Sequence, residues 1–186
     1  LLTGTGIIGA IIIGIPLGVV SACKPNSIWD HISTFVAFIG ASVPNFFLSL
    51  LLIYVLAVKM KLSPTSGMYS AGSNGDWKDL LYHLALPAFV CGIQPIGNYI
   101  KQTKSSVLEV LNEEYIKTAR SKGLRNVVIV IKHAFRNSLI PIVTTLSLSV
   151  PFLIGGAVVT EQIFAWPGIG SLMITAITSR DYPVIM

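Results

Sequence analysis

The sequence predicts an all-α protein that crosses a membrane several times, and three observations support this fold class. Of the 186 residues, 53% are hydrophobic and 11% are charged, whereas a soluble domain usually carries about 25% charged residues. The mean hydropathy is +0.74. Charged residues are absent from four long runs, at residues 1–20, 32–58, 80–100 and 138–160. This composition leaves too little polar surface for a soluble globule and excludes a disordered chain.

The charged residues that do occur are unevenly distributed. Eight of the 13 Lys and Arg residues, but only three of the eight acidic residues, lie between Lys101 and Arg136, so this segment holds the whole net charge of +5. Because cytoplasmic loops are enriched in Lys and Arg, segment 101–137 and the turn at 21–31 are predicted to be cytoplasmic. A basic segment can also bind nucleic acid. Its position between two spanning helices favours a cytoplasmic loop instead.

The first predicted span, residues 1–20, is long enough to cross about 30 Å of hydrocarbon. It contains small residues at every fourth position, and these form a stripe on one helix face where another helix can approach closely: Gly6, Ala10, Gly14 and Gly18. Residues 4–9 also fit a dinucleotide-binding pattern. That pattern requires a preceding strand, so no nucleotide site is predicted.

The second predicted span, 32–58, is interrupted at Pro44 and Asn45. Proline lacks a backbone donor, and an asparagine in lipid must meet protein or water. Asn45 therefore has two interpretations. It bonds a neighbouring helix, which is the commoner use, or it lines a transport pathway. A loop rich in Ser, Gly, Pro and Asn follows at 59–79.

The third predicted span, 80–100, is the most polar. Gln94 and Asn98 are four residues apart and share a helix face, which makes them candidates for lining a pathway. His83, near the start of this span, is predicted to be an interfacial hydrogen-bonding residue rather than a proton relay.

The fourth predicted span, 138–160, is followed by an extracytoplasmic segment, 161–183. Its turn at 164–170 contains Trp166, an aromatic residue suited to a membrane interface. The apolar stretch 171–179 is too short to span a bilayer. It is predicted to be re-entrant or interfacial.

The basic segment contains a predicted amphipathic helix at 107–124. Its apolar residues follow helical spacing, and they are Leu108, Leu111, Tyr115 and Ala119. Acidic residues come early and basic residues late, which complements the helix dipole, and Gly123 is placed to end the helix. A solvated loop touching anionic lipid headgroups is the alternative. An ordered helix with an apolar face favours a protein partner.

Residues 115–124, with the sequence YIKTARSKGL, and residues 132–141, with the sequence KHAFRNSLIP, closely resemble the cytoplasmic loop of ABC importer permeases of the dipeptide, oligopeptide and nickel branch. In the wider family, Glu-Ala-Ala stands where this chain has Lys117, Thr118 and Ala119. Other stretches resemble the branch in the same order, at 14–18, 42–44, 86–88, 164–170 and 180–183. The resemblance implies a type I (MetI-like) permease core. Family members have more than four spans, so the sequence is expected to lack the first and last.

The resemblance also implies a non-catalytic, multi-pass subunit of the bacterial inner membrane, with no cofactor and no metal. Its implied partners are ATP-binding subunits, a second permease subunit in a heterodimer, and an extracytoplasmic solute-binding protein that delivers peptides, glutathione or nickel chelates. The implied ATPase-docking residues are Glu114, Tyr115, Lys117, Ala119, Arg120, Lys122 and Gly123. Tyr115 and Ala119 are expected to enter a cleft of the ATPase, and Arg120 and Lys122 to pair with acids at its rim. A short rigid helix between two spans can transmit such motion.

Two other function classes fit less well. An intramembrane enzyme requires paired catalytic polar groups inside the bilayer, and the four uncharged runs contain no Asp, Glu, Lys or Arg. An ion- or proton-coupled transporter, or a channel, without an ATPase partner is the remaining alternative. It would require buried ionisable groups or a filter, and it leaves the basic segment without a role.

Overall fold

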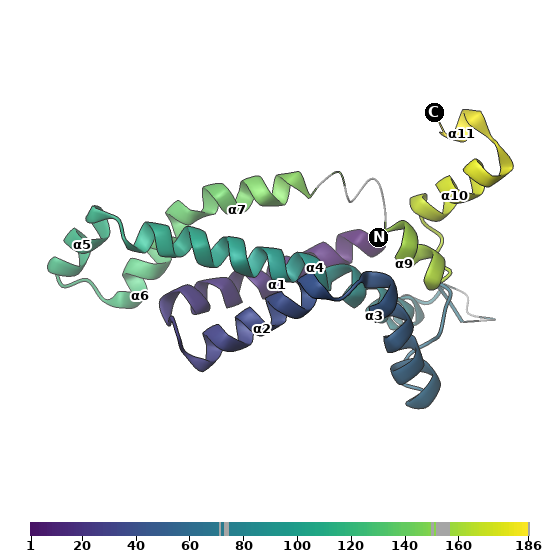
Figure 1. The fold of residues 1–186 in the computed structure, drawn as a ribbon, viewed down its shortest axis with the longest axis horizontal. Helices are drawn as coiled ribbons and strands as arrows, with labels where there is room; N and C mark the ends of the chain where they lie inside the picture. The colour runs from purple at the N-terminus through teal and green to yellow at the C-terminus, as the bar shows by residue number, and fades with distance from the viewer. Residues whose placement is uncertain (71, 73–74, 150, 152–156, 186) are drawn as a thin grey trace. The chain divides into compact units, whose positions relative to one another are not determined.

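The computed structural model describes residues 1–70, 72, 75–149, 151 and 157–185. Within these ranges every regular element is a helix and none is a strand, which confirms the all-α fold class (Figure 1). The elements are α1 (Leu2–Cys23), α2 (Ile28–Ser42), α3 (Asn45–Leu52), the π-helical η1 (Ile53–Lys59), α4 (Trp77–Leu111), α5 (Glu114–Ser121), α6 (Asn126–Val128), the π-helical η2 (Ile129–Phe135), α7 (Arg136–Leu148), α9 (Val158–Ile163), α10 (Ile169–Ser179) and α11 (Tyr182–Ile185).

Three of the described helical stretches are long and apolar enough to cross a membrane, namely Leu2–Cys23, Trp77–Leu111 and Asn126–Leu148. The stretches Ile28–Ser42 and Asn45–Lys59 make a fourth only if they count as one broken span. The break falls where the sequence predicts it. Pro44 has extended backbone angles (φ −62°, ψ 134°), since proline cannot continue the hydrogen-bond ladder of a helix.

Helical structure extends further into the predicted cytoplasmic loop 101–137 than the charge pattern indicates. Helix α4 continues past residue 100 to Leu111, and helical structure resumes at Asn126. Charge marks where lipid contact becomes costly, but Lys, Gln and Glu are good helix formers, so a helix need not end at the membrane surface. Of the predicted fourth span, residues 150 and 152–156 lie outside the described ranges.

The chain divides into two compact units, which are described separately. The first comprises Leu1–Gly9, Val43–Ile93 and Pro151–Met186. In it, Trp166 packs with Leu2 and Leu84, and Phe164 packs with Leu86 and Val90. Trp166 is only 3% exposed, so its indole packs inside the chain and is not presented to lipid headgroups. The turn folds back onto the chain, where the Gly67 N–H donates to the Phe164 carbonyl at 2.8 Å.

His83, in the same unit, is buried and joins the 59–79 loop to α4. Its Nδ1 lies 2.9 Å from the Gly67 carbonyl oxygen, and its Nε2 lies 3.1 Å from the Ser70 Oγ. Asp79 Oδ1 is 3.6 Å from the same Nε2. The prediction that His83 is a hydrogen-bonding residue is confirmed.

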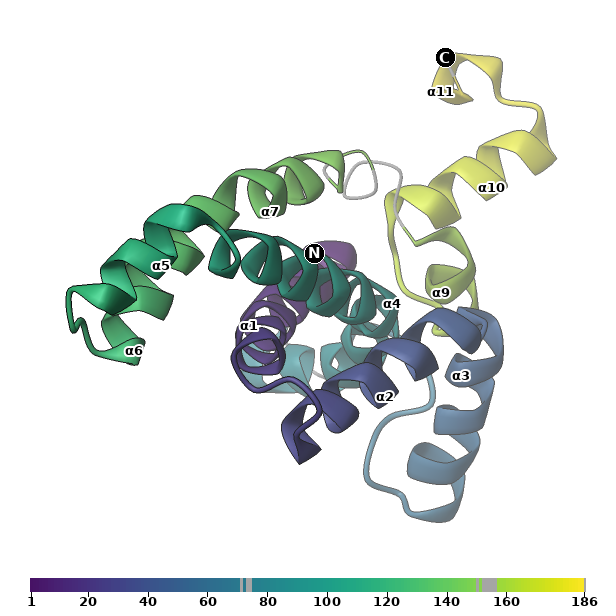
Figure 2. The ribbon, with the colours of Figure 1, turned by 60° about the vertical axis from the view of Figure 1, so that its left-hand side comes forward.

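The second unit comprises Ala10–Ser42 and Gln94–Val150. Its main cluster joins Ala10 of α1, Ala37 of α2 and three residues of α4, namely Ile96, Tyr99 and Ile100. Helices α1 and α4 lie side by side in both ribbon views (Figures 1 and 2).

The small-residue stripe of α1 is the surface that meets α4. A Cβ added at Gly14 would lie 3.0 Å from the Tyr99 Cβ, and one at Gly18 would lie 2.6 Å from the Thr103 Cβ. Gly6, in the first unit, meets Cys91 in the same way. The predicted close approach of a second helix is therefore confirmed.

Candidate functional site

The predicted helix at 107–124 is in fact two helices. Helix α4 ends at Leu111, and Glu113 is extended (φ −66°, ψ 149°) before α5 begins at Glu114. The Asn112 N–H donates to the Glu109 carbonyl and the Glu113 N–H to the Val110 carbonyl, both at 3.1 Å, and these two turns end α4. Figure 2 shows α5 as a separate short helix beyond the end of α4. Helical periodicity alone cannot reveal this break, because the charged residues around it are compatible with either state.

Gly123 ends α5 as predicted. Its φ of +75° is a left-handed conformation that favours glycine. The Gly123 N–H donates to the Arg120 carbonyl at 2.9 Å, and the Leu124 N–H donates to the Ala119 carbonyl at 3.4 Å. These two bonds form a Schellman motif, which satisfies carbonyls left over at the helix end.

The inner face of α5 packs against its own chain. Ile116 is fully buried and Ala119 is 8% exposed, and both contact Ile129 of η2. The sequence predicts that Tyr115 and Ala119 both enter a partner's cleft. Ala119 instead packs against its own chain, because Ile116 brings this face of α5 onto Ile129. Ile116 is the only large aliphatic residue in α5, so the sequence of this helix does indicate which residue anchors it to the chain.

Tyr115 is 42% exposed, and its hydroxyl accepts a hydrogen bond from the Asn137 Nδ2 at 2.8 Å. Within the predicted docking set, Ala119 therefore faces the chain's own cluster. The members that lie at the surface are Glu114, Tyr115, Lys117, Arg120, Lys122 and Gly123. One face of α5 therefore packs against its own chain, and the opposite, charged face is exposed.

A polar stripe follows one face of α4 in the second unit. Gln94 and Asn98 are both exposed, as their spacing predicts for a shared face. The stripe continues at helical spacing through the exposed residues Lys101, Ser105 and Glu109. The opposite face of α4 carries the residues buried against α1.

Asn45 belongs to the first unit, where it begins α3 and is half-buried. Its Oδ1 is buried and has no hydrogen-bond partner among the described residues. The interpretation of Asn45 as an interhelical hydrogen-bonding residue thus gains no support from this oxygen. The interpretation as a pathway residue stays open.

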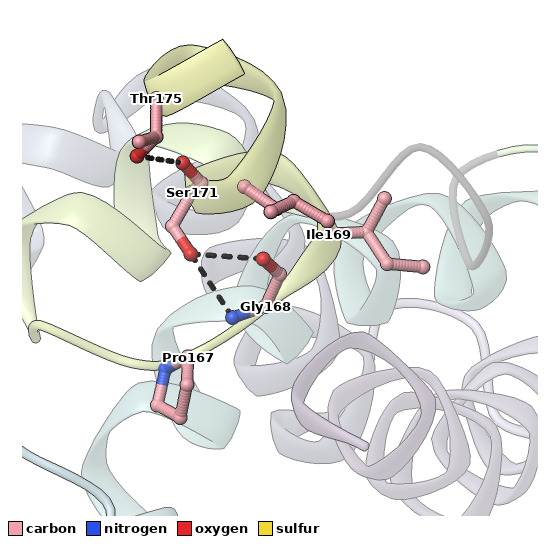
Figure 3. Close-up of a pocket in the computed structure, with 6 residues that line it drawn as sticks. Pro167, Gly168, Ile169, Ser171 and Thr175 are labelled. Carbon is pink, nitrogen blue, oxygen red and sulfur yellow. Dashed lines mark hydrogen bonds between the residues drawn. The ribbon is translucent and has the colours of Figure 1, made fainter. Parts of the chain in front are cut away.

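A hollow of about 540 Å³ opens at the start of α10 and is lined by Pro167, Gly168, Ile169, Ser171, Leu172 and Thr175 (Figure 3). The hydroxyls of Ser171 and Thr175 are engaged inside the chain, with the Gly168 and Ser171 carbonyls respectively. The Ser171 N–H donates to the buried Glu161 carboxylate at 2.9 Å. Both hydroxyl protons of the described lining are therefore already donated within the chain. Within the described ranges, no three His, Cys, Asp or Glu residues gather as metal ligands would.

Comparison with known proteins gives a consistent result. Residues 14–186 match the family described as "Binding-protein-dependent transport system inner membrane component". The chain is 45% identical over 177 residues to the oligopeptide transport system permease protein AppB of Bacillus subtilis, covering 95% of this chain and 56% of that protein. It is 42% identical over its whole length to a putative peptide permease protein of Brucella suis, covering 58% of that protein. It is 40% identical to the dipeptide transport system permease protein DppB of Escherichia coli K12, covering 93% of this chain and 57% of that protein.

The chain therefore spans less than two thirds of the length of these relatives. The match to the family covers most of the chain, and the described helices include several that are long and apolar enough to span a bilayer. The chain is a multi-pass protein of the bacterial inner membrane, and it belongs to the family of inner membrane components of binding-protein-dependent transport systems.

Proposed function

We propose that this chain forms part of the permease subunit of an ATP-driven peptide importer, and that α5 docks on a separate ATP-binding subunit. The observation that carries the proposal is the construction of α5. It is a capped helix, anchored to its own chain through Ile116 and Ala119, and its charged side chains remain exposed. A helix held in this way can transmit displacement to the long helices that flank it.

Peptides are the proposed substrate class, because the relatives are named as oligopeptide, peptide and dipeptide permeases. The proposed assembly contains a second permease subunit, ATP-binding subunits and an extracytoplasmic solute-binding protein. This chain supplies the pathway, and ATP hydrolysis occurs in its partners.

The docking surface is basic. Lys117, Arg120 and Lys122 are exposed at the C-terminal half of α5 and just beyond it. A cleft with an acidic rim would complement these charges and steer the two subunits together. Glu114 stands at the N-terminus of α5, where it complements the helix dipole.

Reversing this charge is expected to weaken docking. The variant Arg120→Glu/Lys122→Glu should lower the affinity for the ATP-binding subunit at least about tenfold, because like charges then face each other across the contact. The measurement is co-purification of the ATP-binding subunit with the full-length permease. The matched control is Lys59→Glu/Lys61→Glu, which reverses two exposed lysines elsewhere in the chain. Undiminished co-purification of the docking-face variant would refute the assignment of α5.

The polar stripe of α4 is the proposed lining of the pathway. Amide side chains are costly against hydrocarbon, so Gln94 and Asn98 must face water or protein. By contrast, the exposed face of α1 carries Ile12, which is 66% exposed and suits lipid.

Cysteines at these positions should therefore differ in accessibility. In a background with Cys23 and Cys91 replaced by serine, Gln94→Cys and Asn98→Cys should react with a charged, membrane-impermeant thiol reagent, and transported peptide should slow the reaction. Ile12→Cys should remain unlabelled, because ionised thiolate and charged reagent do not meet in lipid. Equal labelling at all three positions would argue against a pathway face on α4.

A further inference from the structure

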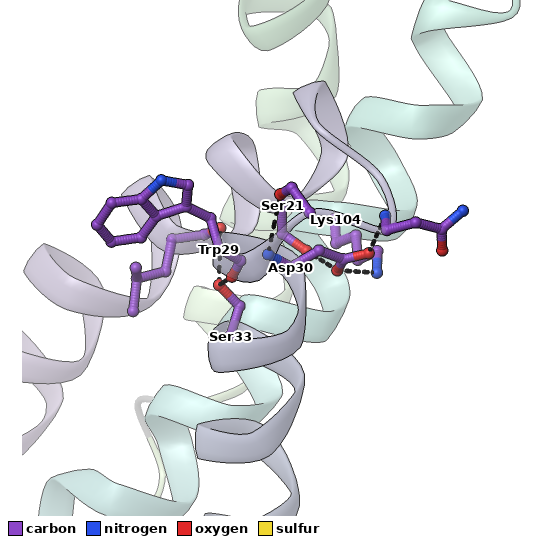
Figure 4. A network of polar contacts seen from close by, with 8 residues as sticks. Ser21, Trp29, Asp30, Ser33 and Lys104 are labelled. Carbon is purple, nitrogen blue, oxygen red and sulfur yellow. Dashed lines mark hydrogen bonds and ion pairs between the residues drawn. The ribbon is translucent and has the colours of Figure 1, made fainter.

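A buried polar network joins three helices of the second unit (Figure 4). Its centre is Asp30 in the first turn of α2, which is 6% exposed. The Asp30 carboxylate accepts hydrogen bonds from the Ser21 hydroxyl of α1 at 2.5 Å and from the Asn26 backbone N–H at 3.0 Å. The Lys104 ammonium of α4 pairs with the same carboxylate.

The network stands where the helices already approach one another closely. Gly18 and Thr103 bring α1 and α4 together, about one turn from Ser21 on α1 and directly before Lys104 on α4. On α2, the Ser33 hydroxyl donates to the Trp29 carbonyl at 2.7 Å and lies 3.5 Å from the Leu17 carbonyl of α1. The three helices therefore meet at one point. There, Lys104 links α4 to the α1–α2 turn through its ion pair with Asp30.

This point lies close to the docking helix along α4. Leu111, where α4 ends, is seven positions after Lys104, which corresponds to roughly 10 Å of helix at 1.5 Å per residue. A displacement of α5 acts on α4 first. The Asp30–Lys104 pair fixes α4 to α1 and α2 before the displacement reaches the polar stripe at Asn98 and Gln94.

We infer that Asp30 and Lys104 are positioning residues for energy coupling, which make α1, α2 and the C-terminal part of α4 move together when α5 is displaced. The inference rests on the proposed docking of α5. Without the pair, α4 can shift against the α1–α2 turn. The motion of the ATP-binding subunit then moves α4 alone and no longer rearranges α1 and α2. Transport per ATP hydrolysed should then fall while the ATP-binding subunit stays bound.

A double neutral variant separates this role from simple stabilisation. Lys104→Met alone leaves a buried carboxylate without its cation, which destabilises the fold. Asp30→Asn/Lys104→Met removes both charges, and such paired replacement of a buried ion pair is often neutral for stability. Asp30→Asn is the milder single variant, because Lys104 is 28% exposed and can be solvated. Lys104→Arg keeps the pair.

The experiment uses the full-length permease with its partners in sealed vesicles, and it measures peptide uptake, ATP hydrolysis and thermal stability. We expect Asp30→Asn and the double variant to bind the ATP-binding subunit normally, with uptake per ATP reduced about tenfold, within the usual range of coupling between sites. The double variant should melt close to wild type, and Lys104→Arg should retain coupling. Uptake per ATP equal to wild type in the double variant would overturn the inference.

The docking proposal fails in a different way. If it is wrong, Arg120→Glu/Lys122→Glu keeps the ATP-binding subunit bound. If only the role of the Asp30–Lys104 pair is wrong, that reversal variant loses the subunit while the double neutral variant couples normally. The two failures are therefore distinguishable in one set of preparations.

Discussion

Replacing Gly123 with proline is expected to abolish peptide uptake while the membrane helices remain folded. Proline fixes φ near −65°, whereas Gly123 has a φ of +75° and donates its N–H to the Arg120 carbonyl. The variant therefore removes the end of α5 and redirects residues 122–125. Because the docking surface includes Lys122, the ATP-binding subunit should no longer respond to the permease. The measurement is ATP hydrolysis stimulated by substrate-loaded binding protein, alongside the amount of permease in the membrane.

Gly123→Asn is the matched control. Asparagine tolerates the left-handed conformation better than other non-glycine residues and keeps the N–H donor. It should retain most of the stimulated ATP hydrolysis. If Gly123→Pro also retains it, the termination of α5 at this glycine has no part in coupling.

Replacing Gly18 with leucine should destabilise the packing of α1 on α4. A Cβ at this position would lie 2.6 Å from the Thr103 Cβ and 2.9 Å from the Ile100 carbonyl oxygen, so the backbones must separate. Inserting bulk into a packed site costs about 1–3 kcal/mol or more. In a bilayer, helix association depends strongly on close van der Waals packing. The expected result is a lower melting temperature of the detergent-solubilised protein and less protein in the membrane.

Gly9→Leu is the comparison for this variant, because a Cβ at Gly9 meets nothing within 4 Å. Leucine is also a better helix former than glycine. Gly9→Leu should therefore leave the melting temperature unchanged or slightly higher. Equal destabilisation by both variants would mean that the packing of the stripe on α4 is not what stabilises this part of the fold.

Features set by local sequence could be predicted well. The four-residue repeat of small residues predicts the face of α1 that packs on α4, and the position of Gly123 predicts the end of α5. The apolar stretch before Arg180 corresponds to α10, an 11-residue helix. In each case the signal and its structural consequence lie within a few turns of chain.

Features set by distant contacts could not be predicted. Asp30 and Lys104 are 74 residues apart, and nothing in the composition around either residue indicates the other. Trp166 becomes a core residue because its turn folds back onto α4, where Leu84 lies. The burial of Ala119 depends on Ile129 of η2, which lies beyond the end of α5, so the periodicity of α5 alone does not indicate it.

The central proposal is that uptake is powered by ATP through a separate subunit docked on α5. It is tested most directly by peptide uptake into vesicles that contain the full-length permease and its partners, with ATP on the cytoplasmic side or with an ion gradient in place of ATP. We predict uptake only with ATP and the solute-binding protein, and its loss in Arg120→Glu/Lys122→Glu. Uptake driven by the ion gradient without ATP would contradict the proposal and would indicate an ion-coupled transporter.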